Sequence, residues 1–223
     1  MRREEVRPHY HALVREDVVS LVTPAGGSLL DVGGGTGATA LRLRSLGRAE
    51  RAGVIDRVAP LTDLDFAHAG DIEDPVFLDH VLESEGPFQT ILCLDILEHL
   101  RDPWALVRKL HGALVPGGTI VASIPNIRNF SALGPLLFKN RWDLTDAGIL
   151  DRTHLRFFVR STAIALMTSS GLALDEVRAK PSGGRRVRLF RTMTAGLLNS
   201  FTDLQYLIRV RNCVPTEGLP CDR

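Results

Sequence analysis

Residues 29–37, LLDVGGGTG, place four glycines within five positions directly after a short apolar run. An apolar run before a turn is typical of a buried strand, and glycine lets a ligand approach the main chain closely. Residues 38–46 then have the pattern of a helix that ends at Gly47. The stretch therefore predicts a strand, a glycine-rich turn and a helix whose N-terminus can face a cofactor.

Strand and helix patterns alternate along the rest of the chain. The other predicted strands are 52–55, 66–70, 88–94, 119–124, 172–177 and 204–210, and the other predicted helices are 74–82, 103–114 and 161–171. This alternation predicts an α/β, Rossmann-like, doubly wound fold. We expect a mostly parallel seven-stranded sheet with helices on both faces and an antiparallel last strand.

A chain of 223 residues suits one α/β domain, so we expect a single domain over residues 1–223. Three segments depart from the alternation. Residues 1–27 predict an N-terminal helical cap, 126–158 an irregular insertion, and 181–202 a basic loop followed by an apolar helix at 193–201. Long irregular segments in compact domains are often functional, so 126–158 is the predicted lid over an acceptor.

The bulk composition excludes several classes of function. The formal net charge is +1, which gives no reason to expect a nucleic-acid partner. The three cysteines form no CxxC pair, which is typical of reduced thiols, and the charged N-terminus does not resemble a signal peptide. No apolar run approaches the ~18 residues of a membrane span. We therefore expect a cytoplasmic protein, with peripheral membrane association through 185–201 as an option.

Several cofactors use glycine-rich turns. A phosphate-binding P-loop is excluded, because no Lys-Ser/Thr pair follows the glycines. Residues 35–40, GTGATA, fit the dinucleotide pattern G-x-G-x-x-G/A, which leaves an NAD-dependent oxidoreductase as an alternative. However, the chain offers no second mononucleotide-binding half beyond the fifth strand.

Five stretches in order resemble the class I S-adenosylmethionine (SAM) methyltransferases. They are LDVGGGTG, GVID ending at Asp56, GDI at 70–72, LDILEHLRDP at 94–103 and LVPGGTIVASIPN at 114–126. The resemblance covers about residues 10–210 and extends to bacterial small-molecule and saccharide methyltransferases and to ubiquinone-biosynthesis O-methyltransferases. It implies SAM as cofactor and S-adenosylhomocysteine as product.

The resemblance also assigns the cofactor side of the site. Glycines of the turn would admit the amino-acid end of SAM, Asp56 would accept from both ribose hydroxyls, and Asp71 would accept from the adenine amine. A turn-forming role is the alternative for Asp71. Many family members have Cys at Gly34, a position that we interpret as permissive. The predicted cofactor residues are Asp31, Gly33, Gly35, Gly37, Asp56, Asp71, Ile72 and Leu94.

Two histidines are the candidate catalytic residues on the acceptor side. His99 follows Asp95 and Glu98 at spacings that would share one face of a helical turn. Similar E-x-x-E-H stretches supply magnesium ligands in ubiquinone-biosynthesis and small-RNA methyltransferases. Here Asp95 replaces the first Glu and Mg²⁺ prefers oxygen ligands, so we expect no metal and keep Asp95, Glu98 and His99 as the weaker alternative.

His154 lies in GILDRTHLRFF, residues 148–158, which resembles a segment of bacterial sugar methyltransferases. His154 would remove a proton from an alcohol, Trp142 would stack on the acceptor, and Asp151 and Arg152 would hydrogen-bond to it. The alternative is an ordered lid held by its own salt bridges.

The sequence therefore predicts methyl transfer from SAM to a small-molecule acceptor, most simply a hydroxyl of a sugar, glycan or secondary metabolite. A non-catalytic SAM-fold binding protein stays open beside the oxidoreductase. The arginine run at 185–191 would attract an anionic acceptor or a membrane surface, or would form a solvated loop.

Overall fold

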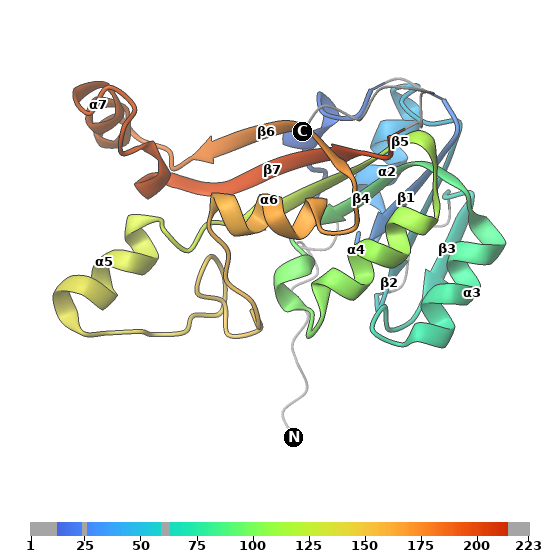
Figure 1. Ribbon diagram of the computed structural model, residues 1–223, viewed down its shortest axis with the longest axis horizontal. Coiled ribbons are helices and arrows are strands. Elements are labelled where there is room, and N and C mark those ends of the chain that lie inside the picture. The colour runs from blue at the N-terminus through green and yellow to red at the C-terminus, as the bar shows by residue number, and fades with distance from the viewer. Residues whose placement is uncertain (1–12, 24–25, 59–62, 214–223) are drawn as a thin grey trace. The chain divides into compact units, whose positions relative to one another are not determined.

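The computed structural model describes residues 13–23, 26–58 and 63–213 (Figure 1). The chain divides into two compact units. The first comprises Met1–Leu94 and Lys109–Val121, and the second comprises Asp95–Arg108 and Ala122–Arg223.

The first unit holds the glycine-rich turn. Its strands pair in the order β3-β2-β1-β4-β5, and β1 is parallel to β2 and β4, as β2 is to β3. In register, Leu30 lies opposite Gly53 on one side and Ile91 on the other. The elements are α1 (Glu16–Val19), β1 (Ser28–Val32), α2 (Ala38–Ser45), β2 (Arg51–Asp56), β3 (Phe66–Ala69), α3 (Pro75–Glu85) and β4 (Phe88–Leu94).

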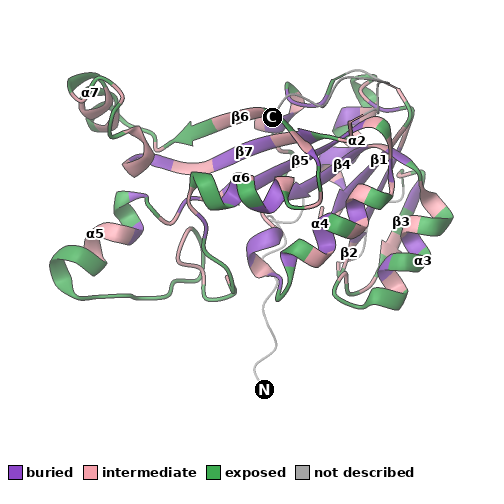
Figure 2. Ribbon diagram, viewed as in Figure 1, coloured by how far each residue is buried: buried purple, intermediate pink, exposed green. Residues whose placement is uncertain are grey.

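The first unit follows from its sequence pattern. β1 and β4 are near-continuous apolar runs and are buried along most of their length (Figure 2). α3 begins where Asp74 accepts from the Val76 N–H and Pro75 occupies the first turn. α2 packs against β1 and β2. The glycine-rich turn therefore connects a buried strand to a helix lying on the same sheet.

The second unit contains the remaining strands and most of the irregular chain. β5 runs from the first unit into the second, where the strand order is β5-β7-β6 and β6 pairs antiparallel with β7. α6 packs on β6 and β7. The elements are η1 (Leu97–His99), α4 (Pro103–Gly112), which crosses between the units, β5 (Leu114–Pro125), α5 (Phe130–Lys139), α6 (Arg160–Thr168), β6 (Ala173–Pro181), α7 (Arg185–Met193), η2 (Asn199–Phe201) and β7 (Asp203–Arg211).

The predicted fold class is confirmed. The seven strands of the described residues have the order β3-β2-β1-β4-β5-β7-β6. β1 is parallel to β2 and β4, β2 is parallel to β3, and the last strand is antiparallel to β6.

Three predictions about the position of helices and strands are wrong. The sequence predicts a helix at 103–114 and a strand that begins only at 119. In the structure, α4 already ends at Gly112 and β5 begins at Leu114, so residues 116–118 belong to β5. The segment 126–158 contains a helix, α5, that the pattern did not predict. The helix predicted at 193–201 begins earlier in the chain, because α7 comprises the arginine-rich residues Arg185–Met193. Arginine is a good helix former, and the positive φ angles of Ala195 and Gly196 follow the end of the helix.

The cysteines differ from the expectation of three reduced thiols. Cys93 is free and buried in β4, whereas Cys213, just after β7, is disulfide-bonded. Within the described ranges, no helix is both long and apolar enough to cross a bilayer. Of the predicted cap at 1–27, residues 1–12 and 24–25 lie outside the described residues, and the rest forms α1 and the chain leading to β1.

Candidate functional site

The glycine-rich turn of the first unit depends on backbone conformations that favour glycine. Gly33, Gly35 and Gly37 have φ values of 69°, 60° and 83°. The N–H of Gly33 donates to the Ile55 carbonyl at 2.8 Å. Gly37 is the N-cap of α2 in the left-handed conformation. The turn is thus fixed to the end of β2 and leads directly into the N-terminus of α2.

The carboxylate of Asp56, the last residue of β2, hydrogen-bonds to the backbone of this turn. Its Oδ2 accepts from the Gly35 N–H at 2.8 Å, and its Oδ1 accepts from the Val58 N–H at 2.9 Å. Each carboxylate oxygen can accept more than one hydrogen bond, so these contacts leave acceptor capacity for a ligand. The predicted ribose ligand is therefore also a structural residue of the turn.

Asp31 is a buried carboxyl group at the end of β1. It is 1% exposed, and its Oδ1 accepts no hydrogen bond from the described residues. Burial, and secondarily the charge of Asp56, raise its pKa to about 7, although Arg15 opposes the shift. A Cβ atom at Gly34 would overlap the Asp31 carboxyl group, so our interpretation of Gly34 as permissive is wrong.

The predicted adenine side lies after β3 and at the end of β4. Asp71 accepts from the Glu73 N–H at 3.0 Å and pairs with Arg57 at 2.5 Å, which is the turn-forming geometry given as the alternative. Ile72 is half-buried beside it, and Leu94, the last residue of β4, is 9% exposed. Leu94 thus lies at the carboxyl end of β4 and Ile72 shortly after the carboxyl end of β3, the edge where ligands bind in open α/β sheets.

The second unit brings together the side chains of Glu98, His99 and His154. Their potential ligand atoms all lie within 4.8 Å of one another. The two imidazole rings meet edge to face, with centroids 4.7 Å apart. The loop carrying His154 is fixed beside η1, because the N–H groups of Leu155 and Arg156 both donate to the Glu98 carbonyl. Backbone pairing therefore builds this cluster from two segments far apart in sequence.

His99 is oriented by Thr153. Its Nδ1 lies 3.3 Å from the Thr153 carbonyl oxygen and 3.0 Å from Thr153 Oγ1. A carbonyl only accepts, so Nδ1 carries the proton and the lone pair of the neutral ring is on Nε2. Burial, and then the neighbouring His154, lower the pKa of His99. His99 is therefore held as a neutral imidazole near pH 7.

His154 has the same tautomer and a carboxylate beside it. Its Nδ1 lies 3.0 Å from the Ile149 carbonyl oxygen, which again places the proton on Nδ1. Its Nε2 lies 4.0 Å from Oε1 of Glu98, and the side chains of His154 and Glu98 are 7% and 1% exposed. A proton that arrives at Nε2 would create an imidazolium cation next to a buried carboxylate.

Asp95 is not among the residues whose ligand atoms lie together in this cluster, so the geometry does not support the weaker alternative of a metal site formed by Asp95, Glu98 and His99. Asp95 has φ of 53°, and its Oδ1 accepts from Ser123 Oγ on β5 at 2.6 Å. Its backbone N–H also faces Ser123. The left-handed backbone directs this carboxylate to β5, and His154 takes the third place beside Glu98 and His99.

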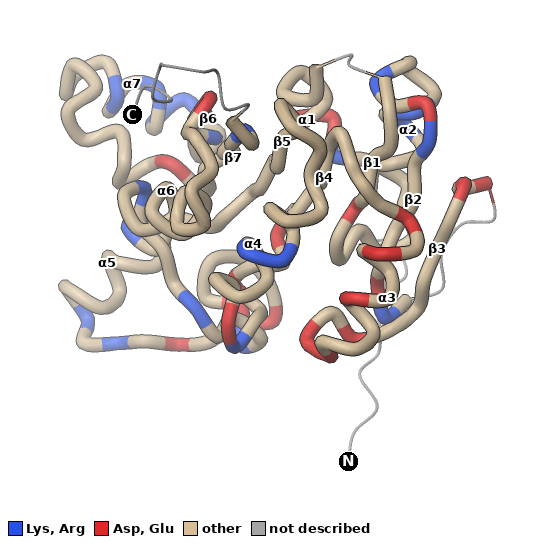
Figure 3. Tube along the Cα trace, turned by 45° about the vertical axis from the view of Figure 1, so that its right-hand side comes forward, with Lys and Arg blue, Asp and Glu red and all other residues tan. Residues whose placement is uncertain are grey.

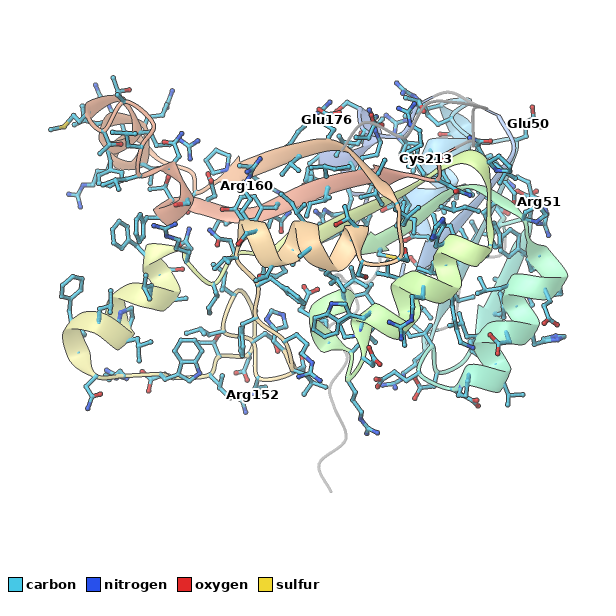
Figure 4. All side chains as sticks on the ribbon, in the orientation of Figure 1. Glu50, Arg51, Arg152, Arg160, Glu176 and Cys213 are labelled. Carbon is cyan, nitrogen blue, oxygen red and sulfur yellow. The ribbon has the colours of Figure 1, made fainter. Side chains whose placement is uncertain are left out.

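The other predicted acceptor residues lie on the loop between α5 and α6. Trp142 is 41% exposed and meets the Phe157 ring edge to face at 5.6 Å. Arg152, labelled in Figure 4, pairs with Asp146 at 2.7 Å on the same loop. Phe158 is core at 4% exposed, whereas Phe157 is 40% exposed. The loop thus has the internal salt bridges given as the alternative, together with an exposed aromatic pair.

Asp151 is connected to His99 through hydrogen bonds of Thr153, a residue that the sequence did not predict to be functional. Oδ1 of Asp151 accepts from the Thr153 N–H at 2.8 Å and from Thr153 Oγ1 at 2.7 Å. Burial raises the pKa of Asp151, but these hydrogen bonds and the two histidines outweigh burial and lower it. The D-x-T spacing of an Asx turn was the available signal for Thr153.

Known proteins place this chain in a family. Residues 3–177 match the family model described as a methyltransferase domain. The chain is 34% identical over 123 residues to the ubiquinone biosynthesis O-methyltransferase of Xanthomonas axonopodis pv. citri. That alignment covers 52% of each protein, so the chain spans about half the length of the curated relatives it matches.

Solved structures agree on the fold. A SAM-dependent methyltransferase from Archaeoglobus fulgidus has a TM-score of 0.60 at 14% identity, over 92% of this chain and 94% of that one. An S-adenosylmethionine-dependent methyltransferase from Mesorhizobium loti has a TM-score of 0.56 at 17% identity, over 87% and 95%. The chain belongs to the methyltransferase domain family and has the fold of the class I SAM-dependent methyltransferases.

Proposed function

We propose that this chain transfers the methyl group of SAM to a hydroxyl group of a small-molecule acceptor of saccharide or secondary-metabolite type. The observation that carries the proposal is the cluster of Glu98, His99 and His154. SAM supplies an activated methyl group, whereas an alcohol must lose its proton to accept it. Two imidazoles beside a buried carboxyl group suit that task. The hydroxyl acceptor also agrees with the O-methyltransferase name of the relatives.

The first unit would bind the cofactor. Asp56 would accept from the ribose hydroxyls with the lone pairs that Gly35 and Val58 leave unused. The first-turn N–H groups of α2, which no helix satisfies internally, would receive the carboxylate of the amino-acid end. Asp31 would orient the turn, Asp71 would accept from the adenine amine, and Ile72 and Leu94 would pack on its ring.

In the second unit, the acceptor hydroxyl would give its proton to Nε2 of His154. The oxygen would then form its bond to the methyl carbon while the bond between that carbon and sulfur breaks, which leaves S-adenosylhomocysteine. The buried Glu98 carboxylate would stabilise the imidazolium, as a carboxylate does in catalytic triads. His99 would present a second neutral nitrogen, and Trp142 and Phe157 would offer the acceptor an aromatic surface.

The same cluster has donors for a divalent cation. Both histidines direct Nδ1–H to backbone carbonyls, which is the arrangement of metal-bound imidazoles. Glu98, His99 and His154 would then hold the ion, which would lower the pKa of a coordinated hydroxyl. Two nitrogen donors suit Zn²⁺ or Mn²⁺ better than Mg²⁺. We keep proton transfer by His154 as the first proposal.

The oxidoreductase alternative loses support from topology. Dinucleotide-binding folds have two parallel βαβαβ halves, whereas the last two strands here, β6 and β7, form an antiparallel pair. Calorimetry separates the two cofactors. We expect heat from S-adenosylhomocysteine and none from NADH, and micromolar NADH binding without S-adenosylhomocysteine binding would contradict the proposal.

Turnover separates an enzyme from a SAM-binding protein without activity. The purified chain is incubated with SAM and panels of sugars, nucleotide-linked sugars and phenols, and S-adenosylhomocysteine is measured. With an accepted substrate, His154→Ala should lower kcat by about 10²–10⁴. SAM affinity should stay unchanged. His80→Ala, which removes an exposed histidine on α3, is the matched control and should retain activity.

A further inference from the structure

Two helices of the second unit expose an unusual amount of apolar surface. Residues 136–148, from the end of α5 into the following loop, are all exposed. α7 and the turn after it contain further large apolar residues that are exposed. Figure 2 colours much of this segment as exposed. We call the following set the α5–α7 surface: Leu136 (41% exposed), Leu137 (61%), Phe138 (80%), Leu189 (61%), Met193 (77%) and Leu197 (87%).

The first turn of α5 contacts α7 and the residues that follow α7. The Phe130 ring of α5 stacks on Phe201 at 5.0 Å and meets Phe190 of α7 at 6.0 Å. Asn129, the N-cap of α5, donates to the Asp203 carbonyl at the start of β7, and buried Asn126 donates to the same carbonyl. These contacts hold α5 and α7 in a fixed arrangement, although their outer side chains remain exposed.

The charge on the α7 side of this surface has one sign, whereas on the α5 side Asp143 pairs with Arg141 and Asp146 with Arg152. Residues 182–202 contain four arginines and neither Asp nor Glu. Arg191 is used internally, because it pairs with Asp203 at 2.6 Å. Arg185, Arg186 and Arg188 are exposed on α7, where Figure 3 shows the basic positions. α7 therefore presents arginines and large apolar side chains together to solvent.

We propose that the α5–α7 surface docks on an anionic lipid bilayer. A short amphipathic helix with basic and apolar side chains lies in the headgroup region, where apolar groups are buried and arginines reach the phosphates. A second copy of this chain is a poorer occupant, since a symmetric contact would bring the arginines of the two α7 helices together. The proposal does not depend on the chemistry of the methyl transfer.

The test is sedimentation of the full chain with two kinds of vesicle. We expect binding to mixed phosphatidylcholine–phosphatidylglycerol vesicles, weaker binding to phosphatidylcholine alone, and a decrease with added salt. Each of Arg185→Gln, Arg186→Gln and Arg188→Gln should lower the partition coefficient for anionic vesicles by about fivefold. Arg108→Gln, at an exposed arginine of α4, should have no effect.

Replacing exposed apolar residues distinguishes insertion of side chains into the bilayer from attraction by charge alone. Phe138→Gln and Met193→Gln should weaken binding to both vesicle types, whereas Val76→Gln on α3, a position as exposed as Met193, should not. Circular dichroism confirms that each variant is folded. Absence of binding to either vesicle type overturns the proposal. So does a dimer in sedimentation velocity, without lipid, that Phe138→Gln or Met193→Gln dissociates.

Discussion

The hydroxyl oxygen of Thr153 lies 3.0 Å from Nδ1 of His99 and 2.7 Å from Oδ1 of Asp151. Its proton goes to the carboxylate and its lone pair receives the imidazole N–H. We therefore predict that Thr153 is a positioning residue that fixes the tautomer of His99.

Thr153→Val removes both side-chain hydrogen bonds while keeping the shape of the residue. We expect kcat to fall by about 10–100-fold, the usual loss when the partner of a functional histidine is removed. Calorimetry should find SAM affinity unchanged, and Thr153→Ser should restore most of the rate. Equal losses in the Val and Ser variants would show that the hydroxyl does not position His99.

Asp56→Ala removes the predicted ribose ligand. Charge-assisted hydrogen bonds contribute about 1.5–3 kcal/mol each, so we expect SAM affinity to fall at least tenfold by calorimetry. The variant also loses the acceptors of Gly35 and Val58, so some loss of stability is expected. Asp65→Ala is the matched control, because Asp65 accepts from the Ala52 N–H but has no predicted cofactor contact. Equal SAM affinity in wild type and Asp56→Ala would contradict the assignment.

Gly34→Ala tests the contact with Asp31. The added Cβ would overlap the buried carboxyl group, so we expect the free energy of unfolding to fall by about 1–3 kcal/mol in urea. Asp31→Ala makes room for it, and the double variant should show a coupling of at least about 0.5 kcal/mol. Strictly additive losses would mean that the two side chains do not meet.

The raised pKa of Asp31 predicts a pH dependence of stability. The pKa of Asp31 is about 7 in the folded protein, against 3.8 for an unperturbed aspartate. Between these pH values the folded protein keeps a proton that the unfolded chain has released, so this group makes stability fall as pH rises toward 7. Asp31→Asn should remove that slope and be more stable than wild type by about 1–4 kcal/mol above pH 7. A wild-type–variant difference that is constant from pH 4 to 8 would contradict this.

Chelation distinguishes the two uses of the histidine cluster. If His154 acts by proton transfer, activity should survive EDTA and added Mg²⁺ should not increase it, because two of the three donors are nitrogens. A loss of activity that Zn²⁺ or Mn²⁺ restores would instead assign Glu98, His99 and His154 to a cation. Binding of Co²⁺, followed by its visible absorption in wild type and His154→Ala, gives a readout independent of turnover.

The sequence by itself determined the parts of this protein that depend on local pattern. Mainly apolar runs predicted β1 and β4. The glycines within 33–37 predicted the turn, because glycine adopts positive φ values readily. The order of motifs after the strands also gave the family. In contrast, the local pattern predicted a helix at 193–201, whereas α7 is Arg185–Met193, and it missed α5.

Only the tertiary structure decided which distant side chains meet. His154 joins Glu98 and His99 because backbone groups of Leu155 and Arg156 pair with the Glu98 carbonyl. Asp95, close in sequence to Glu98, instead turns to Ser123 on β5. Periodicity describes which face of an element a residue occupies, but it contains no information on which loop packs against that face. The candidate catalytic cluster is therefore a product of long-range backbone pairing.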